Sequence, residues 1–323
     1  MASRDIESTE VRNKETNKNP FSSHCNESSE RKWRSWLVPL FVVVNVVMFI
    51  VTMSINNCPN HHTHKSQGKC VVRFLGRLSF EPLKQNSLFG PSFATLEKLG
   101  GLESYRIAYD HEQWRLVTAM WLHAGLVHLI PSMLSLVLIG VRLERQLGFV
   151  RIGIIYILCG YGGSVLSTIS FEDKTYGGSS NISVSGSGPL FGLLGAMLSE
   201  LLINWSIYMK KVAAVLTITF VIAVNIVVGF LPHTDVDNFS HIGAFVTGFL
   251  LGFIFLLRPQ FGWVNKRNRP ADALVKSKYK VHQYVLCVFS VLLLIAGLVL
   301  GTIFVLMRCG YTRAPNSRWQ CGD

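Results

Sequence analysis

The chain is poor in charged residues, and in acidic residues above all. Of its 323 residues only 15% are Asp, Glu, Lys or Arg, against about 25% in an average soluble domain. This shortage, beside 49% hydrophobic residues, argues against an ordinary water-soluble protein. The 31 Lys and Arg outnumber the 19 acids, but they lie in tails and loops rather than in a basic stripe with interleaved aromatics. We therefore expect no nucleic-acid partner.

The first residues lack the apolar run of a cleavable signal peptide, so we expect none, and no cysteine spacing is typical of a zinc site. Residues 1–35 are polar and carry acids, which organelle transit peptides avoid, so we expect a disordered cytosolic tail there. Cys58, Cys70, Cys309 and Cys321 supply four thiols for disulfides if their segments face an oxidising lumen, and their pairing stays open. Three histidines follow Cys58 and fit a solvated loop better than a metal site: His61, His62 and His64.

Long apolar runs are what the chain has in abundance. Each of seven runs can cover the roughly 30 Å of bilayer hydrocarbon at about 1.5 Å per residue. The predicted spans are 36–55, 116–139, 151–171, 186–204, 212–231, 239–257 and 282–307. The sequence therefore predicts an all-α polytopic membrane protein.

The positions of Lys and Arg predict the orientation of these spans. Basic residues flank the cytosolic ends of membrane helices. Here they precede the first span and follow the second, fourth and sixth, and the loop at 258–281 is the richest. We therefore expect a cytosolic N-terminus, a lumenal first loop over 56–115 and a lumenal tail over 308–323. The first loop is too long for a simple connection and ends in Trp114-Arg115, which suits the headgroup boundary.

Two of the spans open on polar residues, which are costly at membrane depth and usually functional. Ser187 begins the fourth span and His241 the sixth. In the predicted topology the second, fourth and sixth spans all enter from the lumenal side, so His123, Ser187 and His241 lie at similar depth. Serine becomes a nucleophile when a base takes its proton, and histidine is the usual base. We expect Ser187 as nucleophile and His241 as general base.

Small residues on the same two spans predict that they pack closely. Such residues recur every three or four positions, which lets two helices approach backbone to backbone in lipid. They are Gly188, Gly192, Ala196 and Ser199 on the fourth span, and Ala244, Gly248 and Gly252 on the sixth. The alternative is a pair of ordinary packed helices with incidental polar residues.

Hydrolysis also requires donors for a developing oxyanion. The backbone N–H groups of Gly186 and Ser187 are candidates because the first turn of a helix has no internal partners. His128 is a candidate side-chain donor, with His123 in support. A metal site at these two histidines is disfavoured because no third ligand converges on them. Phe191, one turn after the serine, is placed to stack on the His241 ring.

These motifs, in their order along the chain, resemble those of the rhomboid intramembrane serine proteases. The resemblance is strongest to plant secretory-pathway members with six core helices and one more at the C-terminus, and it covers residues 36–307. The motifs are Trp114-Arg115, Leu122-His123-Ala124-Gly125 with His128, Arg142 and Glu144 before Gly148, Ser187-Gly188, and Asn238-Phe239-Ser240-His241-Ile242-Gly243.

The resemblance implies a rhomboid-like helical bundle with a catalytic core over 36–257 and a seventh helix over 282–307. It implies a Ser–His dyad without an acid and without metal or cofactor. Substrates would be single-span membrane proteins cleaved near the lumenal face. The compartment would be the Golgi, another endomembrane or the plasma membrane.

The sequence departs from the family pattern at three positions. Ser185 replaces the first Gly of Gly-x-Ser-Gly, Ser132 stands where an oxyanion-donating Asn is expected, and Ala244 replaces the second Gly of His-x-Gly-Gly. A competent dyad with a weakened oxyanion hole is the expectation. The alternative is a rhomboid-like pseudoprotease that binds membrane clients without cleavage. A transporter or channel is disfavoured because no inverted repeats or broken helix pairs are visible.

Overall fold

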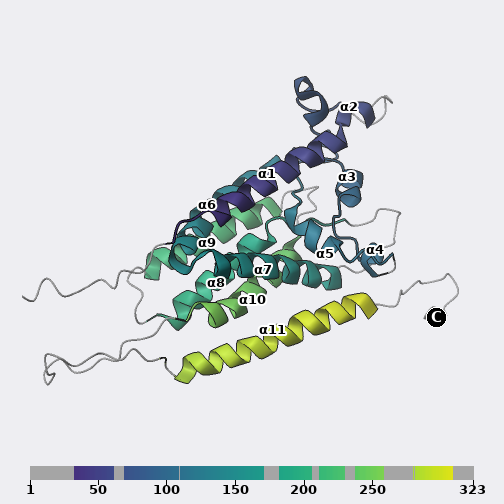
Figure 1. Ribbon diagram of the computed structural model, residues 1–323. Helices are drawn as coiled ribbons and strands as arrows, with labels where there is room; N and C mark the ends of the chain where they lie inside the picture. The colour runs from purple at the N-terminus through teal and green to yellow at the C-terminus, as the bar shows by residue number, and fades with distance from the viewer. Residues whose placement is uncertain are drawn as a thin grey trace, which may run out of the picture. The chain divides into compact units, whose positions relative to one another are not determined.

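The computed structural model describes residues 33–61, 69–108, 110–170, 182–205, 211–229, 237–257, 279 and 281–307. Within these ranges the regular structure is helical (Figure 1). Strand-like pairing in the same residues is limited to the isolated bridges Val71–Phe80 and Leu102–Ser183. The predicted all-α fold class is confirmed. Most of the expected tail at 1–35, nearly all of the basic loop at 258–281 and the tail at 308–323 lie outside the described residues.

Seven apolar helices among the described residues correspond to the seven predicted spans. They are α1 (Leu37–Asn56), α6 (Leu126–Leu147), α7 (Phe149–Ser170), α8 (Gly188–Ile203), α9 (Lys211–Gly229), α10 (Asn238–Phe255) and α11 (Val281–Met307). Among the described residues, five of them are long and apolar enough to cross a bilayer, and α8 and α9 are shorter apolar helices. The protein is therefore an integral membrane protein. Figure 1 shows α11, in yellow, alongside α10 and α7, which it contacts.

The predicted start of the second span, residue 116, is wrong by ten residues. The chain instead forms α5 (Arg115–Thr118), the 3-10 turn η2 (Ala119–Trp121) and an extended stretch before α6 begins at Leu126. Gly125 allows this, because a Cβ at that position would collide with the backbone of Leu88. The apolar run from 116 to 125 thus belongs to the fold of the first loop. At the other end α6 continues to Leu147, so it includes Arg142 and Arg145, which were expected in the following loop.

The long first loop has its own structure, as its length predicted. A disulfide joins Cys58 to Cys70 near the start of this loop. The other two candidate cysteines, Cys309 and Cys321, lie outside the described residues. Short helical segments then follow: α2 (Cys58–His61), η1 (Arg73–Leu78), α3 (Phe93–Lys98) and α4 (Ser104–Ala108), before α5 and η2.

Glu144, near the end of α6, caps the start of α1. Its carboxylate accepts the backbone N–H groups of Trp36, Leu37 and Val38, each at 2.9 Å, and the Ser35 hydroxyl at 2.7 Å. The first N–H groups of a helix have no internal partners, and a negative charge there also interacts favourably with the positive end of the helix dipole. Hydrogen bonds to a charged group are worth about 1.5–3 kcal/mol each. Glu144 therefore holds α1 against α6, the helix that carries His128.

Helix α8 lies at the centre of the fold. All but two of its residues are buried, and its most extensive packing is against α10 and then α7. Because α8 begins directly after Ser187 and α10 carries His241 in its first turn, this packing decides the geometry of the two polar residues.

Candidate active site

Ser187 and His241 meet at the adjoining starts of α8 and α10. The Oγ atom of Ser187 lies 2.5 Å from Nε2 of His241, and both side chains are buried. Ser187 is the N-cap of α8, and Pro189 follows in the first turn, where its missing N–H costs nothing. The arrangement has the geometry of a nucleophile hydrogen-bonded to a base.

Close approach of the two helix backbones brings these residues together. A Cβ added to Gly248 on α10 would collide with the backbone of Gly192 on α8. One at Gly252 would collide with Ser199, and one at Gly188 would lie 3.1 Å from the Ser240 hydroxyl and 3.8 Å from Ala244. The small residues singled out in the sequence thus lie along the α8–α10 contact.

Phe191 fixes the imidazole of His241. The two rings are stacked, with centroids 4.1 Å apart and planes 12° apart. The contact joins the first turn of α8 to the first turn of α10. It leaves the edge of the imidazole that carries Nε2 directed at Ser187.

His128, in the first turn of α6, is a second histidine at the same hydroxyl. Its Nε2 lies 2.9 Å from Ser187 Oγ. The Ser187 hydroxyl has one proton, so it donates to one imidazole and accepts from the N–H of the other. The shorter contact favours His241 as the acceptor. His128 is then the donor, and the same N–H can turn to an oxyanion formed beside Ser187.

Ser132, one turn after His128, takes part in a polar contact that the sequence did not reveal. Its hydroxyl has two acceptors for its one proton, the His128 carbonyl at 2.8 Å and Oδ1 of Asn225 on α9 at 3.2 Å. Asn225 is buried, and its amide also donates to Ser135 at 3.3 Å. These contacts join α6 to α9. A lone Asn inside an apolar run was the available signal, since polar residues at membrane depth are rarely incidental.

Gly186 has a structural partner in place of the open N–H expected from the sequence. Its N–H donates to the Leu122 carbonyl at 3.0 Å. The non-helical backbone bonds of the described residues include none donated by the Ser187 N–H, so this group stays a candidate oxyanion donor. His123 lies in the extended stretch before α6, its ring centroid 5.2 Å from that of His128. A Cβ on Gly186 would meet the His123 ring, so glycine is required there.

Ser185, one of the departures from the family pattern, is buried and contacts α7. Its hydroxyl lies 3.3 Å from that of Ser164. Ala244, another departure, is fully buried beside Gly163 of α7.

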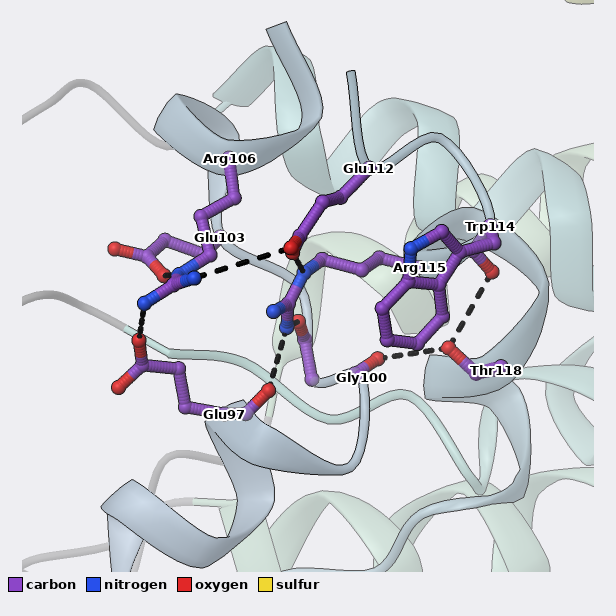
Figure 2. Close-up of polar contacts among 9 residues, drawn as sticks. Glu97, Gly100, Glu103, Arg106, Glu112, Trp114, Arg115 and Thr118 are labelled. Carbon is purple, nitrogen blue, oxygen red and sulfur yellow. Dashed lines mark hydrogen bonds and ion pairs between the residues drawn. The ribbon is translucent and has the colours of Figure 1, made fainter. Parts of the chain in front are cut away.

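The first loop is attached directly to the segment that leads into Ser187. Leu102 and Ser183 exchange backbone hydrogen bonds of 2.7 and 3.0 Å, and the Ser185 N–H donates to Ala119. This part of the loop is organised by the buried Arg115 (Figure 2), whose guanidinium donates to the carbonyls of Glu97 at 2.6 Å and Gly101 at 2.8 Å.

A polar network surrounds Arg115 in Figure 2. Its Nε donates to Glu112 at 2.5 Å, and its guanidinium carbon lies 5.0 Å from the centre of the Trp114 ring. Nearby, Arg106 joins Glu97 at 2.5 Å to Glu103 at 2.9 Å. Burial and the nearby Glu97 raise the pKa of Glu103, and Arg106 acts in the opposite direction.

Together, Ser187, His241 and His128 are placed as a nucleophile, a base and an N–H donor, which are the groups that acyl transfer requires. Within the ranges that the structure describes, no three His, Cys, Asp or Glu side chains gather closely enough to hold a metal ion.

Comparison with known proteins gives one family. A model of the Rhomboid domain matches residues 110–258. The chain is 51% identical to RHOMBOID-like protein 1 of Arabidopsis thaliana over 90% of this chain and 74% of the relative. It is 48% identical to RHOMBOID-like protein 2 of the same plant over 99% of this chain and 100% of the relative.

Two further relatives differ in what their names say of activity. Inactive RHOMBOID-like protein 8 of Arabidopsis thaliana is 34% identical over 92% of this chain and 86% of the relative. Rhomboid-type serine protease 2 of Emericella nidulans is 34% identical over 46% of this chain and 28% of the relative.

Proposed function

The chain belongs to the rhomboid family, and we propose that it is an intramembrane serine endopeptidase that cleaves single-span membrane proteins. The observation that carries the proposal is the 2.5 Å contact between Ser187 Oγ and His241 Nε2 at the junction of α8 and α10. The partners of the protein are then the bilayer and the single-span proteins within it, and no nucleic acid is involved.

Acylation starts at Ser187. Its Oγ attacks the carbonyl carbon of the scissile peptide bond while its proton passes to Nε2 of His241. The negative charge that develops on the carbonyl oxygen is stabilised by the His128 N–H and the Ser187 backbone N–H. His241 then gives its proton to the leaving amine as the C–N bond breaks, which leaves an ester on Ser187.

Deacylation repeats these roles with water. His241 takes a proton from a water molecule, whose oxygen attacks the ester carbonyl. When the second tetrahedral intermediate collapses, the bond to Ser187 breaks and His241 returns the proton to Oγ. The carboxylate product leaves, and the dyad is restored without a cofactor.

The proposal includes a location in the secretory pathway, in the Golgi, another endomembrane or the plasma membrane. The Cys58–Cys70 disulfide supports a first loop that faces an oxidising compartment. The first loop is joined to the Ser187 segment, so this orientation also puts the cleavage site near the lumenal face. The N-terminus is then cytosolic and the C-terminus lumenal.

The second candidate is a pseudoprotease that binds membrane clients without cutting them. Ser132 and Ser185 favour it, because each replaces a residue expected at the family's catalytic motifs. The similarity to a relative named as inactive favours it as well. The closeness of Ser187 to both His241 and His128 favours the protease.

The deciding experiment reconstitutes the full chain in liposomes with a model single-span substrate and follows the cleaved fragments. We expect cleavage by the unaltered protein and none by Ser187→Ala. Ser199→Ala is the matched control: it removes a buried hydroxyl from α8 that donates to the Ala196 carbonyl, away from His241. Cleavage by Ser187→Ala would overturn the proposal, and substrate binding without product would favour the pseudoprotease.

A further inference from the structure

Asp237 is a buried acid that the proposed reaction does not use. It immediately precedes α10 and is only 2% exposed. Among the described residues it takes part in no ion pair. A buried carboxyl group without a cation is costly unless hydrogen bonds compensate for it. Its surroundings therefore indicate what the group is for.

One side of Asp237 fixes the turn that carries His241. Its Oδ1 accepts the Ser240 N–H at 3.0 Å, and its backbone carbonyl accepts the His241 N–H at 3.3 Å. This is the pattern of a helix N-cap. The acid thus sets the direction in which the first turn of α10 leaves the preceding chain.

The other side of Asp237 faces the segment that leads to Ser187. Burial raises the pKa of this carboxyl group, and the hydroxyls of Ser167 on α7 and of Ser183, which favour its charged form, offset part of that rise. Oδ2 and these two hydroxyls are all buried, and none has a hydrogen-bond partner of ordinary geometry among the described residues. Unpaired buried polar atoms are rare in folded proteins. The simplest way to satisfy all three atoms is for both hydroxyls to donate to Oδ2.

Ser183 is well placed to transmit this contact. It lies four positions before Ser187, and its backbone is held by the exchange of hydrogen bonds with Leu102. A group that holds both Ser183 and the first turn of α10 therefore joins the nucleophile's segment to the base's helix.

We propose that Asp237 is a positioning residue for the dyad: Oδ1 holds the turn of His241, and Oδ2 holds Ser183 and Ser167, so that one carboxyl group sets the separation of Ser187 and His241. This inference rests on the proposed protease function, and it adds a residue outside the dyad on which the activity depends.

Three substitutions separate the two sides of this group. Asp237→Ser keeps an N-cap but is too short to reach Ser183, so we expect kcat to fall roughly 10- to 100-fold, as small misplacements of reacting groups do. KM should stay unchanged, because Asp237 is buried and is proposed to act through the dyad rather than on the substrate. Asp237→Ala should lose at least as much. Asp237→Asn keeps the size and can bond on both sides, so it should restore kcat to within about threefold of the unaltered protein.

The matched control is Ser92→Ala, which removes the N-cap of α3 in the first loop, where the Ser92 hydroxyl accepts the Thr95 N–H. We expect its kcat to equal that of the unaltered protein. If Asp237→Ser also kept full kcat, or if Asp237→Asn were no better than Asp237→Ser, the positioning role would be overturned.

A thermal-stability cycle tests the same contact without using activity. Asp237→Ser and Ser183→Ala should lower the Tm of the full chain in detergent by less together than the sum of their separate effects, since each removes the same contact. Additive effects would overturn the inference. If the unaltered protein showed no cleavage at all, the proposed function would fail, and the cycle would still decide whether Asp237 joins the two segments.

Discussion

The Nε2 atom of His241 lies 2.5 Å from the Oγ atom of Ser187, although 54 positions separate the two residues along the chain. Helix α9 lies between them in sequence but does not separate them in space. Their meeting depends on glycines, because α8 and α10 approach so closely that Gly192 and Gly248 touch through their backbones. The first predictions concern this contact and the groups around it.

Gly248→Ala should separate the two helices and with them the dyad. The new Cβ would collide with the backbone of Gly192, which cannot rotate away as a flexible side chain would. Overpacking of this kind costs about 1–3 kcal/mol, so the Tm in detergent should fall. Gly297→Ala on α11 is the control, because no atom of the described residues beyond its own helix turn lies within 4 Å of its added Cβ. Equal Tm values for the two variants would contradict the packing account.

His128→Ala should slow cleavage without abolishing it. The His128 N–H is the proposed oxyanion donor, and loss of one such donor costs about 10²–10³ in kcat. His241→Ala should cost more, because it removes the base. The values of kcat and KM for a model substrate decide the order. If His128→Ala were the more damaging variant, the roles of the two histidines would have to be exchanged.

Ser132→Asn should raise kcat if the oxyanion hole is the weak part of the site. The amide is longer than the hydroxyl, and the gain should be at most the roughly 10²–10³ that one donor is worth. Because Ser132 contacts Asn225, the substitution is best made together with Asn225→Ser, which exchanges the pair and keeps the volume between α6 and α9. If kcat were unchanged in Ser132→Asn and in the double variant with Asn225→Ser, another group would supply the oxyanion donor.

Arg115→Lys should destabilise the first loop and slow the reaction of Ser187. Lysine lacks the planar fork with which Arg115 reaches two carbonyls and Glu112 at once. Buried acceptors left unpaired cost about 1–3 kcal/mol, which a lower Tm in detergent would report. Arg73→Lys, at an exposed position in η1, is the control. Equal Tm values would show that the network does not support the loop.

Most of the helices could be predicted because apolar length is a direct requirement of the bilayer. Ser187 and His241 stood out for the same reason, since polar residues at the ends of apolar runs are conspicuous. The start of α6 could not be predicted from composition. Residues 116–125 are apolar enough to continue a span, and the close packing of Gly125 against the backbone of Leu88, 37 positions earlier, cannot be seen in their composition.

The residues missed by sequence reasoning act through contacts between distant segments. Asn225 is one amide in an apolar helix, and its meaning depends on Ser132 and Ser135 of α6. In the sequence Asp237 is an ordinary acid of a loop, and only the structure shows that it is buried beside Ser167 and Ser183. Neither contact follows from spacing along one helix, so neither could be predicted from periodicity.

The measurement that tests the central claim most directly is labelling of the detergent-solubilised full chain by a fluorophosphonate, a probe that reacts with activated serines. The account predicts labelling of the unaltered protein at Ser187, and its loss in both Ser187→Ala and His241→Ala. Labelling of the unaltered protein no stronger than that of the two variants, together with no cleavage in a sensitive substrate assay, would contradict an active dyad.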